Sequence, residues 1–113
     1  MKKEFMLSKK NNLKNEKNKQ ETIQVEVLNG CGVDKAGEIF TSYLRKNNFD
    51  VIQTGNYISI DINNTLIIDR SGNIDKAIII ADSLGIEHKN VIQQVNKKYY
   101  PDASIIIAKD LYK

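Results

Sequence analysis

The sequence predicts an α+β domain: a two-layer α/β sandwich of the ferredoxin-like β-α-β-β-α-β kind with an extra strand, in which the helices cover one face of a single sheet. Strand and helix patterns alternate over residues 23–108 in the order β-α-β-(β)-β-α-β-β, with no long connection. Ile dominates the apolar residues, which favours strands over a helical bundle. Two helices are too few for both faces of a sheet, so one face is expected to be half-solvated.

The first half of the pattern is a strand, a helix and a strand. Residues 23–28 alternate apolar and polar side chains, as a half-buried strand does, and run into a turn at 29–32. One apolar stripe with helical spacing follows, formed by Ala36, Ile39, Phe40, Tyr43 and Leu44. A second strand is predicted at 49–53, ended by Thr54, Gly55 and Asn56.

The second half repeats this order. Residues 57–62 alternate and predict an edge strand or an extended loop, whereas 65–69 are apolar enough for a central strand. Ser71, Gly72 and Asn73 are expected to cap a second helix that ends at Gly85. Strands are predicted at 90–95 and 103–108, with a loop at 99–102 between them.

Charge divides the chain into two parts. Residues 1–21 contain seven Lys and three Glu, whereas residues 22–113 carry a net charge of −1. We expect 1–21 to be a disordered basic tail or linker and 22–113 to be the folded domain. A near-neutral domain gives no reason to expect nucleic-acid binding. No stretch reaches the roughly 18 apolar residues of a membrane span, so membrane contact is expected only through a tether absent from this chain.

Composition argues against most catalytic and metal sites. The chain has one cysteine, Cys31, and one histidine, His88. A single Cys excludes an intramolecular disulfide and the usual Cys-rich zinc sites, and a single His leaves little general-base chemistry near neutral pH. We therefore expect no metal, no cofactor and no enzymatic activity.

The turn at 29–33 is the one segment that resembles a ligand site. Gly30 and Gly32 follow a strand and precede a helix, where backbone N–H groups and the helix dipole can hold an anion. A dinucleotide fingerprint would need a third Gly, but Lys35 occupies that position. A P-loop would need Lys and Ser or Thr at positions 38 and 39, where Glu and Ile stand instead. The structural alternative is that small residues let the helix fold back closely on the sheet.

Cys31 raises a further alternative, a small thiol enzyme. A thiol at a helix N-terminus can act as a nucleophile if a base lies nearby. His88 is the only candidate base, and a parallel arrangement would place it toward the opposite end of the sheet. A small side chain that fills a turn is the favoured interpretation of Cys31.

Several of these segments together resemble the LytR C-terminal domain family. Residues 25–33, VEVLNGCGV, are similar to its opening V-x-V-L-N-G-[TSC]-G-V. The similarity continues in order through Ala36, through NFDV at 48–51 (GFDV in the family) and through 65–72. It closes on DASIIIAKDL at 102–111, similar to ADVTVVLGKDY. Asn48 and Ala108 stand where the family has Gly, and Leu111 stands where it has an aromatic residue.

The resemblance implies an accessory role in the bacterial cell envelope. Such domains often end LytR–CpsA–Psr proteins, which attach polymers to peptidoglycan through a separate catalytic domain. The favoured hypothesis is a non-enzymatic module, membrane-tethered outside the cytoplasm, that binds a wall glycan, an anionic polymer or an envelope protein. For an anionic ligand, the candidate binding residues are Asn29, Gly30, Cys31, Gly32, Arg70 and Lys109. The alternative is assembly with a protein partner or a second copy through a sheet edge, with 57–62 as the candidate strand.

Overall fold

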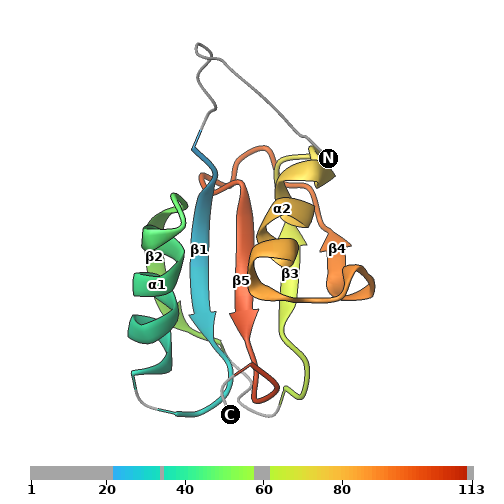
Figure 1. Cartoon of the computed structure of the whole chain (residues 1–113). Coiled ribbons are helices and arrows are strands. Elements are labelled where there is room, and N and C mark those ends of the chain that lie inside the picture. The colour runs from blue at the N-terminus through green and yellow to red at the C-terminus, as the bar shows by residue number, and fades with distance from the viewer. Residues whose placement is uncertain (1–21, 34, 58–61, 112–113) are drawn as a thin grey trace, which may run out of the picture.

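The computed structural model describes residues 22–33, 35–57 and 62–111. They form one five-stranded sheet with two helices, α1 and α2, lying on the same face (Figure 1). The strands are β1 (Gln24–Asn29), β2 (Asp50–Asn56), β3 (Leu66–Asp69), β4 (Val91–Gln93) and β5 (Ala103–Ile107). The helices are α1 (Ala36–Lys46) and α2 (Ile74–Leu84), and a short 3₁₀ helix, η1 (His88–Asn90), precedes β4. The predicted α+β two-layer sandwich is confirmed.

The strand order is β2-β1-β5-β3-β4. β1 pairs in parallel with β2 and β5, β3 pairs in parallel with β4, and β3 and β5 are antiparallel. The sheet differs from a ferredoxin-like one, where the strands of the two β-α-β units interleave. Here each unit keeps its own strands side by side, and the extra strand β5 lies between the units.

The core lies between the sheet and the helices. Val25, Val27, Ile105 and Ile107 point from the central strands toward α1 and α2, where they meet Leu44 and a cluster of other apolar side chains. Side chains alternate along a strand, so Glu26 and Ser104 point to the opposite, helix-free face. The apolar stripe predicted for the first helix is only partly buried: Ala36 and Leu44 enter the core, whereas Ile39 and Tyr43 are exposed.

Local signals account for the ends of both helices. The Asn73 side chain accepts a hydrogen bond from the Asp75 N–H at the start of α2, and Gly85 ends that helix with φ 72°, both as predicted. After α1 the chain turns through Asn48, which has φ 71°. Asn tolerates this left-handed conformation better than most residues do, which explains how it can replace the Gly that the family has there.

Three strand predictions need correction. β2 does not end before Thr54: residues 54–56 pair with residues 27–29 of β1, so these polar residues and Gly55 extend the strand. The last predicted strands are shorter than expected, with β4 covering Val91–Gln93 and β5 ending at Ile107. The prediction for 57–62 lies largely outside the described residues, because 58–61 are not described.

Asp69 connects the end of β3 to the start of α2. This fully buried carboxylate accepts hydrogen bonds from the Ser71 hydroxyl at 2.9 Å, from the N–H groups of Ser71 and Gly72, and from the Gln93 amide at 2.8 Å. Burial alone would raise the pKa of Asp69, but these hydrogen bonds outweigh it and lower the pKa below its usual value near 3.8.

The stabilisation from Asp69 should therefore disappear in acid. Its ionised form is favoured in the folded state, so its contribution is complete above about pH 4 and is lost as pH falls through the lowered folded-state pKa. Urea unfolding of the wild type and of Asp69→Asn should show a difference in unfolding free energy at neutral pH that shrinks below pH 4. A difference that stays constant down to the acid limit would contradict this assignment.

Candidate functional site

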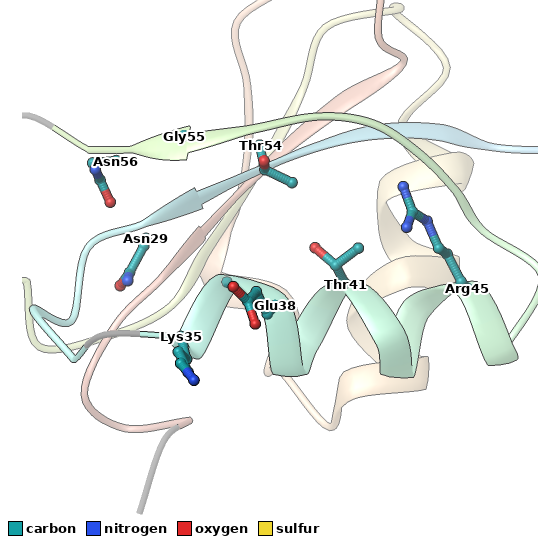
Figure 2. A pocket seen from close by; sticks show the side chains of 9 residues that line it. Asn29, Lys35, Glu38, Thr41, Arg45, Thr54, Gly55 and Asn56 are labelled. Atoms are coloured by element: carbon teal, nitrogen blue, oxygen red, sulfur yellow. The ribbon is translucent and has the colours of Figure 1, made fainter.

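An open groove of about 460 Å³ lies between α1 and the edge strand β2 (Figure 2). Its wall on one side is α1, and its wall on the other is the second half of β2, with the end of β1 closing one end. The described lining residues are polar or Gly, and none is aromatic: Asn29, Lys35, Gly37, Glu38, Thr41, Arg45, Thr54, Gly55 and Asn56. Two of these side chains are cationic and one is anionic.

Asn29 of the predicted 29–33 turn lines one end of this groove, but two backbone N–H groups of the turn already have partners within the protein. The Asn29 side chain accepts from the Cys31 N–H at 3.1 Å and from the Cys31 thiol at 3.2 Å, and it donates to the Val33 carbonyl at 2.9 Å. The Gly30 N–H donates to the Ile107 carbonyl at 2.8 Å. Two of the N–H groups considered for an anion therefore hold the turn together instead.

Gly30 leaves little room for a side chain because β5 approaches it closely. A Cβ atom at position 30 would lie 3.1 Å from the Ile107 carbonyl oxygen and 3.2 Å from the Ile106 side chain. Gly32 has φ 76°, a conformation that favours glycine. The structure thus gives both glycines a backbone role, although the close approach at Gly30 is to β5 and not to the following helix.

The sequence-predicted site residues divide between the two ends of the sheet. Lys109 follows β5 at the end where the 29–33 turn also lies. Arg70 follows β3, which runs antiparallel to β5, so it lies at the opposite end. The structure therefore places Lys109 at the same end of the sheet as Asn29, Gly30, Cys31 and Gly32. Arg70 lies at the other end.

Arg70 belongs to a polar network on the helix-free face. Its Nε donates to the Ser104 hydroxyl at 3.1 Å, and its guanidinium lies 4.8 Å from the centre of the Tyr99 ring. Glu26, only 3% exposed, accepts from the Ser104 hydroxyl at 2.8 Å, from the Tyr99 hydroxyl and from the Gln53 amide. The hydrogen bond to Glu26 and burial raise the pKa of Tyr99 above 10. Arg70 and Tyr99 thus fasten the loop before β5 to the sheet.

Cys31 and His88 do not form a catalytic pair. Cys31 is 5% exposed and packs in the core cluster. The prediction that His88 lies toward the opposite end of the sheet from the 29–33 turn was wrong. β3 is antiparallel to β5 and parallel to β4, so β4 begins at the end of the sheet where the turn lies, and η1 with His88 precedes it there. β5 and β3 still separate β1 from β4, and the His88 ring interacts with Asp82 at 2.8 Å.

Of the nine described lining residues, only Asn29 was predicted from the sequence as a site residue, and three of the other eight have distinctive local structure. Lys35 precedes α1 with φ 71°, a left-handed conformation that costs a non-glycine residue about 1 kcal/mol. The hydroxyl of Thr41 is buried without a hydrogen-bond partner among the described residues. The Arg45 guanidinium donates to the Val51 carbonyl at 3.0 Å. The one sequence signal for Lys35 was its position just before the first helix, where a dinucleotide-binding motif has its third Gly.

The described part of the chain lacks two other kinds of feature. It holds no group of three or more His, Cys, Asp or Glu placed to bind a metal ion. None of the described helices combines the length and the apolar character needed to cross a membrane.

The fold and the groove define a small α/β module with a polar ligand-sized surface and no assembled catalytic group among the described residues. The sequence matches the LytR_C family, described as "LytR cell envelope-related transcriptional attenuator", over residues 22–111. The chain therefore belongs to the LytR_C family, an accessory domain of the bacterial cell envelope that is not a known catalytic family. No curated protein and no solved structure gave a significant match.

Two threonines allow a direct test of the unpartnered hydroxyl. The Thr65 hydroxyl donates to Asp110 at 2.8 Å and accepts from the Ala108 N–H at 3.0 Å, so Thr65→Val should lower the unfolding free energy by about 1–3 kcal/mol. Thr41→Val removes a hydroxyl that has no partner and should leave stability unchanged or raise it. Urea unfolding of both variants measures this, and an equal loss in the two would show that the Thr41 hydroxyl is satisfied in solution.

Proposed function

We propose that this domain is a non-enzymatic accessory module that binds a polymer of the bacterial cell wall. The observation that carries the proposal is the open polar groove between α1 and β2, in a domain of an envelope-associated family. Its exposed amide, hydroxyl and charged side chains suit a hydrated polymer better than an apolar ligand. The envelope association supports a location outside the cytoplasm, tethered to the membrane.

The groove residues support binding rather than catalysis. Among the described residues of the lining, Glu38 is the only acidic one, and neither Cys31 nor His88 belongs to that set. Hydrolysis of a glycan would normally need two carboxylates across the bond to be broken. Lys35 and Arg45, by contrast, give the groove a positive charge although residues 22–113 carry −1 as a whole.

Binding to purified peptidoglycan sacculi tests this function. The full chain should sediment with sacculi, and a variant with all seven lysines of residues 1–21 replaced by Gln should still do so, because the groove and not the basic tail holds the polymer. Sacculi stripped of their attached anionic polymer, compared at low and high salt, show which component is bound. Retention of the wild type alone would assign binding to the tail, and no retention of either protein would contradict the proposal.

Assembly through the β2 edge is the second candidate. β2 is an edge strand whose residues 53–56 are exposed, and among the described strands it pairs only with β1. Such an edge can add a strand from another chain. If assembly is the function, sedimentation velocity of the full chain should show a mass that rises with concentration. A monomer mass at every concentration would exclude self-assembly as the function.

A further inference from the structure

The hydroxyl of Thr41 is the one buried side-chain polar atom without a hydrogen-bond partner among the described residues. Thr41 is 7% exposed and sits in the middle of α1. A buried hydroxyl without a partner destabilises the folded protein, and polar groups in such positions are usually paired. The other buried polar side chains, such as Glu26, Thr65 and Asp69, all have partners. Thr41 is therefore an exception that a bound ligand would explain.

Thr41 faces the groove. It contributes to the groove lining, and Figure 2 shows its side chain on the surface of α1 that turns toward β1 and β2. Glu38 and Arg45 lie one helical turn before and after it, and both are exposed. Because these are long side chains with several rotamers, their rotation opens a path from the groove to the hydroxyl.

The two cations lie at opposite ends of this wall. Lys35 precedes α1 and Arg45 is in its last turn, so about 15 Å of helix separates them at the usual rise per residue. Lys35 makes no ion pair with any described residue, and Arg45 uses one of its five N–H donors on the Val51 carbonyl. An elongated ligand can therefore meet a cation at each end and Thr41 between them.

The rest of the lining narrows the ligand class. Asn29, Thr54 and Asn56 offer amide and hydroxyl groups along β1 and β2, and Glu38 can accept from ligand hydroxyls. Neutral glycans bind largely by stacking sugar faces on aromatic rings, and none of the groove residues that the structure describes is aromatic. A ligand that carries both hydroxyl and acidic groups would match the amide, hydroxyl and cationic side chains of the groove.

We infer that the α1–β2 groove is the polymer site of this module, and that it takes a hydroxyl-rich chain carrying phosphate or carboxylate groups, one hydroxyl of which pairs with Thr41. This inference rests on the proposed function and names its ligand class and site. Lys35 and Arg45 bind acidic groups of the polymer. A hydroxyl of the polymer supplies the hydrogen-bond partner that Thr41 lacks in the unbound protein. No bond is made or broken.

Calorimetric titration of the full chain tests the site with three probes: poly(glycerol phosphate), oligogalacturonate and neutral maltohexaose. The acidic probes should bind and the neutral one should not. Thr41→Val should weaken binding about three- to tenfold, the range for one neutral hydrogen bond, without loss of stability. Lys35→Gln and Arg45→Gln should each weaken binding and reduce its salt dependence, because each removes one charge contact.

Lys98→Gln is the matched control, because it removes one positive charge from an exposed lysine in the loop before β5, outside the groove lining. It should bind like the wild type. If the acidic probes and sacculi bind but the three groove variants behave like Lys98→Gln, the site is elsewhere and only this inference fails. If maltohexaose binds as tightly as the acidic probes, the ligand class is wrong. If neither the acidic probes nor the sacculi bind, the proposed function fails together with this inference.

Discussion

The pairing of β5 with β1 on one side and β3 on the other is the contact on which the rest of the structure depends. Among the described residues the two β-α-β units share no other strand pairing, so without β5 this sheet would separate into two pieces. All five residues of β5 are buried, and its side chains alternate between the helical layer and the opposite face. The position of α1, and with it the groove, follows from β1, whose place in the sheet is set by β5.

Apolar packing alone would not fix the register of β5. Its run of three isoleucines could slip by two residues and still present Ile to both faces. Polar contacts exclude that slip: Ser104 must meet Glu26, and the Asp102 carboxylate must receive the Gln24 N–H at 2.9 Å. The network on the helix-free face therefore specifies one arrangement of the strands, while the groove lies at the β2 edge, where side chains are free to meet a ligand.

Local signals predicted most of the elements, but not how they are arranged. The α2 helix was predictable at both ends because Asn73 and Gly85 act through neighbouring backbone groups alone. The strand order was not, because the antiparallel approach of β5 to β3 depends on contacts between residues distant in sequence. That order also decided that Arg70 lies away from the 29–33 turn. Thr41 could not be identified from sequence, because a hydroxyl becomes unpartnered only when its surroundings are known.

The groove also bears on how the sequence would change under selection. Two of its lining residues carry a cost in the unbound protein: Lys35 in a left-handed backbone conformation and Thr41 with an unpartnered hydroxyl. Selection for thermal stability alone would favour Gly at the first position and an apolar residue at the second, since each removes a local penalty. A design that optimises stability at these two positions would therefore also remove two of the side chains on which the proposed binding site depends.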